Sequence, residues 1–310
     1  MKIFRFGLPL YREIIKKLSY GKGYGKKTSV RKIMSFFDYL FRSEEVNVHG
    51  HKMFLTKKGF EEYSTKGIYG ELDTLTVEKL IKKNDFVVDV GAAIGYYTLI
   101  FAKAVGKEGK VFAFEPKDDR FKLLEKNISR NNYSNVVLEK KAIMHDEQKS
   151  GKFFARDDGI AGLRYINDLD DLPESGDSYK HTISTEINSV QLDRYLEKQS
   201  KLDKISFMKI DVDGPELHVL EGSRSLLKNK NLKIFMEWDR ISAKQSGCEP
   251  NKILDIIEEN DFMMFYPNYK EGKFFEISRK ELMEIPEVVD DGINMLFVKD
   301  SSILEKNGLL

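Results

Sequence analysis

Residues 85–98, which read DFVVDVGAAIGYYT, constrain the fold of this chain most strongly. An apolar run bounded by turn residues is typical of a parallel strand that is covered on both faces. Gly91 and Gly95 then allow the backbone to turn and to pass close to a ligand. A second apolar run, residues 111–114, ends in Glu115, where such folds hold the ribose hydroxyls of a nucleotide. We therefore expect a nucleoside site at the carboxyl edge of a parallel sheet.

The glycine loop departs from the G-x-G-x-x-G fingerprint that binds a dinucleotide pyrophosphate. Ala93 replaces the middle glycine, Tyr96 occupies the third position, and Asp89 stands two residues before the first glycine. A carboxylate at that point repels a pyrophosphate but suits a ligand that carries positive charge. S-adenosylmethionine, with its ammonium and sulfonium groups, is such a ligand. The loop, Asp89 and Glu115 together favour this cofactor over a nicotinamide dinucleotide.

Three segments resemble the FkbM-type methyltransferases, and they occur in the family's order. They are residues 89–98 (DVGAAIGYYT), 109–116 (GKVFAFEP) and 209–216 (KIDVDGPE). The resemblance extends over about residues 67–299. It implies a class I methyltransferase fold, which is a Rossmann-like, doubly wound α/β sheet, mostly parallel with an antiparallel last strand. It also implies transfer of a methyl group from S-adenosylmethionine, usually to an oxygen.

The same resemblance implies which residues form the site. Its cofactor-binding residues are Asp89, Gly91, Ala93, Gly95, Glu115 and Ala142. Its catalytic candidates are Asp211, Asp213, Glu216 and Glu237. The chain departs from the family pattern at Ala93, where Asn is common, and at Asp213, where Glu is common. The first change removes a hydrogen-bonding side chain near the cofactor, and the second shortens a carboxylate near the acceptor.

Carboxylates end four of the expected strands: Asp89, Glu115, Asp211 and Glu237. Ligands of open α/β sheets bind outside the carboxyl ends of the strands, and carboxylates gathered there repel one another unless cations or donors compensate them. Asp211 and Glu237 could instead pair with Lys209 or Arg240. Without a histidine or cysteine cluster, oxygen ligands alone would favour Mg²⁺ or Ca²⁺ over zinc. A metal site would want more ligands than Asp211 and Glu237, so we expect a mechanism without a metal ion. Asp211 or Glu216 is then the expected acceptor of the hydroxyl proton.

The other patterns predict alternating strands and helices. Residues 46–56 alternate in polarity and predict a hairpin, and residues 145–186 predict a second hairpin with a mobile loop. Helices are expected around residues 75–81, 121–128, 217–220 and 253–257, and further strands at 136–138, 205–210, 232–236 and 294–298 and near residue 262.

The charge is distributed unevenly. The net charge is +1, which argues against nucleic-acid binding, yet residues 1–42 hold eleven Lys or Arg and two acidic residues. Aromatic and aliphatic residues lie between these charges, which suits either the surface of an anionic membrane or a helical cap on the catalytic domain. The predicted domains are an N-terminal extension (1–45), the methyltransferase domain (46–300) and a tail (301–310). The single cysteine, Cys248, fits a reducing compartment, so we expect a cytoplasmic protein.

The methyl acceptor is expected to be a hydroxyl on a sugar, a glycan or a small metabolite. Trp238 is a candidate for the acceptor site, because it could stack on a sugar ring, although a core position is an equal alternative. His218 is expected to be a half-buried helix residue rather than a base. Two other functions stay open: a nicotinamide-dependent oxidoreductase, and a catalytically inactive methyltransferase-like binding module.

Overall fold

The computed structural model describes residues 45–55, 68–146, 151–155, 183–287 and 292–310. The chain forms two compact units, Met1–Gly70 and Glu71–Leu310. In the first unit, β1 (Val46–Val48) pairs antiparallel with β2 (His51–Met53). This confirms the hairpin predicted over residues 46–56. Residues 1–44 lie outside the described residues, so the alternatives of membrane contact and cap stay predictions, as do the domain limits at residues 45 and 300.

The second unit is built on an eight-stranded sheet with the order β13-β12-β14-β11-β10-β3-β4-β5. The strands β5, β4, β3, β10 and β11 run parallel, and β14 is antiparallel to both β11 and β12. This is the predicted mostly parallel sheet with an antiparallel last strand. The strands are β3 (Phe86–Val90), β4 (Lys110–Phe114), β5 (Val136–Glu139), β10 (Ile205–Ile210), β11 (Lys233–Trp238), β12 (Met263–Asn268), β13 (Lys273–Glu276) and β14 (Ile293–Val298).

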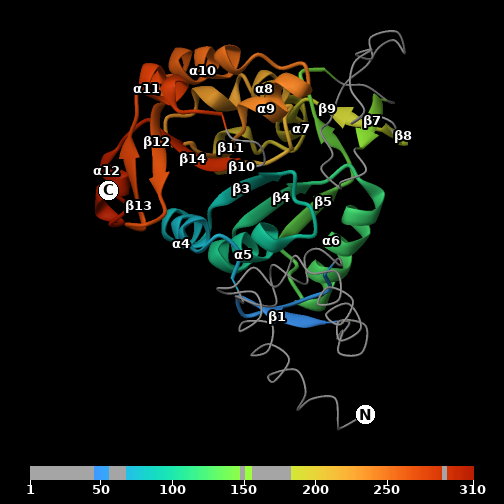
Figure 1. The fold of residues 1–310 in the computed structure, drawn as a ribbon. Coiled ribbons are helices and arrows are strands. Elements are labelled where there is room, and N and C mark those ends of the chain that lie inside the picture. The colour runs from blue at the N-terminus through green and yellow to red at the C-terminus, as the bar shows by residue number, and fades with distance from the viewer. Residues whose placement is uncertain (1–44, 56–67, 147–150, 156–182, 288–291) are drawn as a thin grey trace, which may run out of the picture. The chain divides into compact units, whose positions relative to one another are not determined.

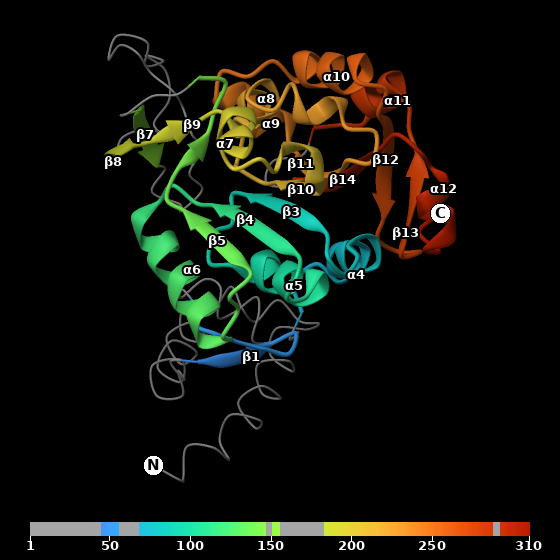
Figure 2. The ribbon, with the colours of Figure 1, turned by 180° about the vertical axis from the view of Figure 1, so that it is seen from behind.

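Helices cover both faces of this sheet. Helices α4, α5 and α6 lie on one face, and α7, α8 and α10 lie on the other, as the two opposite views show (Figures 1 and 2). The helices are α4 (Glu71–Leu80), α5 (Tyr96–Val105), α6 (Asp118–Arg130), α7 (Leu192–Lys198), α8 (Glu216–Glu221), α9 (Arg240–Gln245), α10 (Pro250–Glu259), α11 (Arg279–Glu284) and α12 (Ser302–Lys306). The fold is therefore doubly wound.

The sequential order of the strands reverses between β3 and β10. From β3 the chain proceeds outward to β4 and β5, and then returns to the other side of β3 to form β10 and β11. A crevice forms at such a switch point, because the loops after the two strands leave in opposite directions. This topology places the end of β3 beside the end of β10, where Asp211 pairs its backbone N–H with the carbonyl of Val90 at 3.0 Å.

The central strands are buried on both faces. Val88, Phe112, Met208 and Ile234 on four of these strands are fully buried, as the continuous apolar runs predict. Phe101 on α5 is also fully buried, and its ring lies 5.8 Å from that of Phe207 on β10. Each such side chain contributes about 1.5–3 kcal/mol relative to an exposed one. The core therefore fixes the strand ends that carry the candidate site.

Two short pairs of strands lie outside the main sheet. β6 (Ala142–Ile143) pairs parallel with β9 (Ser189–Val190), and β7 (Gly151–Ala155) pairs antiparallel with β8 (Ile183–Ile187). The second pair confirms the hairpin predicted within residues 145–186. The mobile loop predicted there falls in residues 156–182, outside the described residues.

Several short elements have no counterpart among the predictions. Helix α11 begins with a capping box, in which Ser278 and Glu281 bond each other's backbone, and this S-x-x-E pattern is visible in the sequence. The predicted tail contains α12, whose Leu304 is fully buried, and Leu309 accepts a hydrogen bond from the Phe274 backbone N–H at 2.7 Å. No helix within the described residues is long and apolar enough to cross a membrane.

We expect Leu304→Ala to lower the free energy of unfolding by about 2–5 kcal/mol, because the change leaves a cavity under a fully buried position. Glu305→Ala, one position further along α12 and exposed, is the control and should change the value by less than about 0.5 kcal/mol. Urea unfolding followed by circular dichroism measures both. Equal midpoints for the two variants would show that residues 301–310 do not stabilise the second unit.

Candidate active site

The loop after β3 touches the chain after β10 through Gly91. The φ angle of Gly91 is +83°, and a Cβ at this position would lie 1.8 Å from the carbonyl oxygen of Asp211. Its N–H also donates to the carbonyl of Phe114 at 3.0 Å. Only glycine fits between these two strand ends without displacing backbone. Gly91 and Asp211, which meet at this contact, both line the cavity described next.

A cavity lies in front of this contact, at the carboxyl ends of β3, β4, β6 and β10. Its lining consists of Val90, Gly91, Phe114, Glu115, Pro116, Lys117, Arg120, Lys141, Ala142, Ile143, Asp211, Val212, Asp213 and Pro215. Of the predicted cofactor residues, Gly91, Glu115 and Ala142 line it. Asp211 and Asp213, two of the catalytic candidates, line its other side.

Glu115 is held in place by the backbone of two neighbouring loops. Its Oε2 accepts the N–H of Ala93 at 2.9 Å and its Oε1 accepts the N–H of Lys117 at 2.8 Å. Each carboxylate oxygen has a second lone pair, so both can still accept a ligand hydroxyl. Burial raises the pKa of Glu115, while the nearby Arg120 guanidinium opposes that rise. Ala93 therefore acts through its backbone, and the Asn-to-Ala difference leaves this bond intact.

Two predicted cofactor residues, Asp89 and Gly95, do not line the cavity. Asp89 is 1% exposed, and its Oδ2 accepts a hydrogen bond from the Thr98 hydroxyl, with 2.5 Å between the two oxygen atoms. A Cβ at Gly95 would lie 2.7 Å from Leu124 Cδ1 on α6, so this glycine allows α5 to pack closely on α6. Both residues shape the loop without lining the cavity. The sequence could not separate these roles, because Asp89 is turned by its bond to Thr98 on α5 and Gly95 is placed by the packing of α6.

Asp211, Asp213 and Glu237 form an acidic rim beside the cavity, and the first two of them line it. One carboxylate oxygen from each lies within 4.8 Å of those of the other two. Asp211 follows β10, and Glu237 is the penultimate residue of the adjacent strand β11, so both lie at strand ends as predicted. Burial raises the pKa of Glu237 well above its ordinary value, and Asp211 adds to this rise. Glu237 therefore binds a proton more readily than an exposed glutamate.

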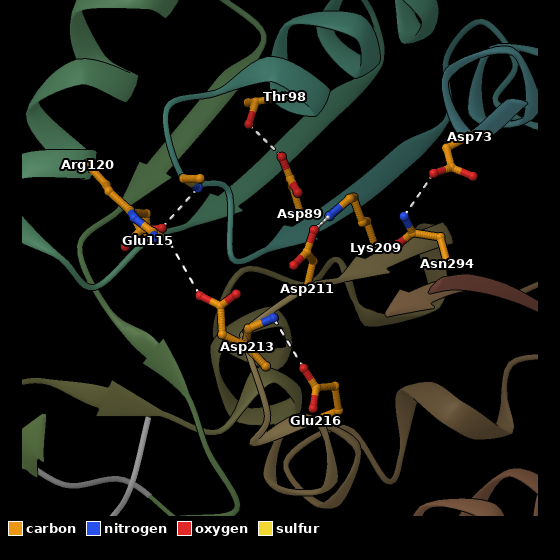
Figure 3. Close-up of polar contacts among 12 residues, drawn as sticks. Asp73, Asp89, Thr98, Glu115, Arg120, Lys209, Asp211, Asp213, Glu216 and Asn294 are labelled. Carbon is orange, nitrogen blue, oxygen red and sulfur yellow. Dashed lines mark hydrogen bonds and ion pairs between the residues drawn. The ribbon is translucent and has the colours of Figure 1, made fainter. Parts of the chain in front are cut away.

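Lys209 is the cation that compensates this rim (Figure 3). Its side chain is buried, and its Nζ donates to Asp211 Oδ2 at 2.7 Å. The same Nζ lies 4.7 Å from the centre of the Tyr97 ring, a cation–π distance. Burial lowers the pKa of Lys209, but the carboxylates of Asp211 and Asp89 outweigh it, so the pKa lies above its ordinary value.

Two further groups adjoin the rim and were missing from the predicted site. The guanidinium Nη1 of Arg120, on α6, lies 3.6 Å from the carboxylate Oδ2 of Asp213. Asp73 on α4 accepts a hydrogen bond from Asn294 at 3.0 Å (Figure 3). Burial raises the pKa of Asp73 to about 6. No local pattern in the sequence marks either residue, since each comes to the rim through helix packing.

Glu216 supports the turn after β10. Its Oε1 accepts the N–H of Gly214 at 3.1 Å and the N–H of Val212 at 3.3 Å. This turn contains Asp213 at a φ of +59°, a conformation that Asp tolerates better than most residues. Burial raises the pKa of Glu216 to about 7. Glu216 is 3% exposed and does not line the cavity, so its position favours holding the loop over meeting an acceptor.

Trp238 lies apart from the cofactor cavity. It is 6% exposed and lines a second cavity, beyond β11, together with Tyr266, Arg240 and Ile293. Arg240 donates to the carbonyl oxygens of Met283, at 2.9 Å, and Ile285. Trp238 is thus both buried and beside a cavity, so the two alternatives for this residue are not exclusive.

His218 and Cys248 have side chains that can be reactive, but neither lines the cavity in front of Gly91. His218 on α8 is half-buried, as expected, and does not line the cofactor cavity. Burial lowers the pKa of His218. Cys248 is 2% exposed, and burial raises the pKa of its thiol to about 12. A thiol that stays protonated is a poor nucleophile.

The family follows from the sequence match to a model described as the methyltransferase FkbM domain, which covers residues 89–264. The chain belongs to this family. The match contains all three segments that carried the resemblance: residues 89–98, 109–116 and 209–216.

Each of the following proteins similar to this chain is named as a methyltransferase. "Hexuronic acid methyltransferase AglP" of Haloferax volcanii is 24% identical over 268 residues, which is 82% of this chain and 99% of that protein. "Methyltransferase 1" of Beauveria bassiana is 26% identical over 147 residues, and the match spans 58% of that protein and 45% of this chain. A crystal structure of methyltransferase FkbM from Methylobacillus flagellatus is 15% identical, with a TM-score of 0.40, and covers 70% of this chain and 43% of that one.

We expect Gly91→Ala to abolish binding of S-adenosylmethionine, because the new Cβ would overlap the Asp211 carbonyl and displace the loop. Gly106→Ala is the matched control: its φ is also positive, at +71°, but a Cβ there meets nothing within 4 Å. Calorimetric titration of both variants separates the collision from backbone strain. Wild-type affinity in a folded Gly91→Ala protein would contradict the assignment of the loop.

Proposed function

We propose that this protein transfers a methyl group from S-adenosylmethionine to a hydroxyl of a sugar or sugar-containing acceptor. The observation that carries the proposal is the convergence of Asp211, Asp213 and Glu237 beside the cavity in front of Gly91. A glycine loop with a buried carboxylate supports nucleoside binding on one side. A carboxylate rim supports proton removal on the other.

The residues of the cavity fit the cofactor. Gly91 lets the loop after β3 lie directly against the backbone of Asp211 at the edge of the cavity, and Glu115 retains free lone pairs for ribose hydroxyls. Ala142 and Ile143 offer an apolar wall for an adenine ring. The carboxylates of Asp211 and Asp213, which line the cavity, are partners for the positive charge of a ligand. When bound, S-adenosylmethionine supplies a methyl carbon that its sulfonium group activates.

Asp211 is the proposed proton acceptor. Its Oδ2 is fixed by Lys209, and it lines the cavity with a side chain that is 33% exposed. A fixed, accessible carboxylate can take the proton of a hydroxyl as that oxygen becomes a nucleophile, which commonly contributes about 10²–10⁴-fold to a rate. Asp213 and Glu237 lie within reach of the same hydroxyl. Alignment of donor and acceptor supplies the larger share of the catalysis.

A metal-free mechanism fits the rim because Lys209 already places a positive charge there. The ammonium group bonds Asp211 directly and lies near enough to Asp89 and Glu237 to affect all three carboxylates. It can stabilise the ionised base without a divalent ion. Two catalytic candidates thus acquire separate proposed roles: Asp211 accepts the proton, and Glu216 holds the turn that presents Asp213.

The acceptor is proposed to be a sugar, and a hexuronic acid is the first candidate. The support is the similarity to the hexuronic acid methyltransferase, which extends over 99% of that protein. The second cavity offers the rings of Trp238 and Tyr266, and aromatic rings present apolar faces on which a sugar ring can pack. The residue before Trp238 is Glu237 of the rim, so one strand end could serve both the reacting hydroxyl and the ring.

We expect Asp211→Asn to lower kcat by about 10²-fold or more while the Kd of S-adenosylmethionine changes little, because the amide cannot accept the proton. Asp255→Asn, on the exposed face of α10, is the control and should leave kcat unchanged. Kinetics use uronic-acid and neutral sugars as acceptors, with labelled cofactor. Full activity in Asp211→Asn would remove this residue from the chemistry, and a loss of kcat in EDTA that Mg²⁺ restores but Zn²⁺ does not would overturn the metal-free choice.

We also expect Lys209→Met to move the acidic limb of the pH–rate profile to higher pH. Burial raises the pKa of Glu237 and of Asp213, and the ammonium group opposes that rise, so its removal raises both pKa values further. Lys204→Met, just before β10, keeps the rim charge and should leave the profile unchanged. A profile that does not move in a folded Lys209→Met protein would show that Lys209 does not tune the rim.

A further inference from the structure

A cluster of metal-ligating side chains lies outside the active site. His145 follows β6, and His218 and Glu221 lie on α8. One potential ligand atom from each of the three lies within 4.8 Å of those of the other two. His145 is far in the sequence from His218 and Glu221, which are three residues apart, so the spacing of the histidines gives no metal signature. The fold brings them together.

The distances suit a small tetrahedral ion. His218 Nδ1 lies 3.4 Å from Glu221 Oε2. Zinc binds nitrogen and carboxylate oxygen at roughly 2.0–2.2 Å, and tetrahedral geometry then separates two ligand atoms by roughly 3.3–3.5 Å. The rings of His145 and His218 lie 4.9 Å apart, between centroids, with a tilt of 41°. The ligand atom of His145 lies within 4.8 Å of the other two, so the proposed site needs a side-chain rotation to bring it to tetrahedral separation.

The backbone around the cluster is fixed without an ion. A Cβ at Gly222 would lie 2.2 Å from the carbonyl oxygen of Met144, so the end of α8 packs directly on the residue before His145. The N–H of Met144 donates to Val190 at 3.1 Å, and the side chain of Gln191 donates to the carbonyl of His145. Pre-positioned ligands favour binding, because less ordering entropy is lost.

We propose that His145, His218 and Glu221 form a zinc site, distinct from the active site. Two imidazoles and one carboxylate are ligands that zinc prefers, whereas the oxygen-only rim of Asp211, Asp213 and Glu237 would suit Mg²⁺ or Ca²⁺. Water completes the tetrahedron, or Asp146, whose Oδ1 lies 3.7 Å from His145 Nε2. The competing possibility is a cluster of hydrogen-bonded side chains without an ion.

The site would join two walls of the cofactor cavity. The strand before His145, β6, supplies the apolar wall of Ala142 and Ile143. Helix α8 begins at Glu216, which holds the turn that contains Asp213. An ion that binds this site in the folded state alone therefore stabilises that state by RT ln(1 + c/Kd), where c is the concentration of the free ion. It takes no part in proton transfer, so kcat at ordinary temperature does not depend on it.

The test is calorimetric titration of the metal-stripped full-length chain with Zn²⁺, repeated with Co²⁺, whose visible absorption reports tetrahedral imidazole ligation. We expect one ion per chain and a higher Tm with Zn²⁺ but not with Mg²⁺. His145→Asn and His218→Asn should each weaken binding by more than about 100-fold, since even a residue behind a ligand commonly matters by about 10–100-fold. Glu221→Gln should weaken binding as well.

Matched controls separate this site from others. His49→Asn, Glu258→Gln and Asp211→Asn should bind Zn²⁺ as the parent protein does. His145→Asn keeps the test sound if His218→Asn misfolds, because the side chain of His145 is 42% exposed. The proposal is overturned if Zn²⁺ does not bind, if binding survives both histidine changes, or if it is lost in Asp211→Asn instead.

Discussion

The hydrogen-bonded ion pair of Lys209 and Asp211 is the interaction on which the candidate site depends. It lies at the switch point of the sheet, where β3 and β10 are neighbours. Taking an ammonium group out of water costs several kcal/mol unless charges and donors compensate it. Asp89, Asp211 and Glu237 all contribute to that compensation, so the cation and the carboxylates require one another. Replacement of the lysine alone would leave the buried carboxylates without their cation.

The same switch point joins the glycine loop after β3 to the acidic rim. Gly91 contacts the backbone of Asp211 so closely that the two cannot move independently. A ligand that orders the glycine loop therefore also fixes the backbone of the proposed base. On the other side, Glu216 bonds the two N–H groups that shape the turn around Asp213. The position of the base thus depends on backbone contacts more than on its own side-chain packing.

The parts of this architecture that were predictable from the sequence are those with local causes. The apolar runs gave β3, β4, β10 and β11, and the acidic residues after them gave the rim, because parallel strands present their carboxyl ends at one edge. The directions of Asp89 and Gly95 were not predictable, since packing against Thr98 and α6 turns them away from the cavity. The burial of Lys209 shows only in hindsight, as the one charge inside the strand ISFMKI. The meeting of His145 and His218 depends on tertiary contacts alone.

The charges of the rim also have a consequence for the order of events in the proposed reaction. Burial raises the pKa of Glu237, and the carboxylates of Asp211, Glu216 and Asp213 add to this rise while Lys209 opposes it. A sulfonium group nearby adds positive charge and lowers the pKa of the surrounding carboxyls. A bound methyl donor would therefore favour the ionised forms of Glu237 and Asp213, whose pKa values burial raises. The thioether left by transfer would carry one positive charge less than the donor, so its attraction to the carboxylates would be weaker. One electrostatic arrangement can thus favour binding of the donor, ionisation of these carboxyls and departure of the product.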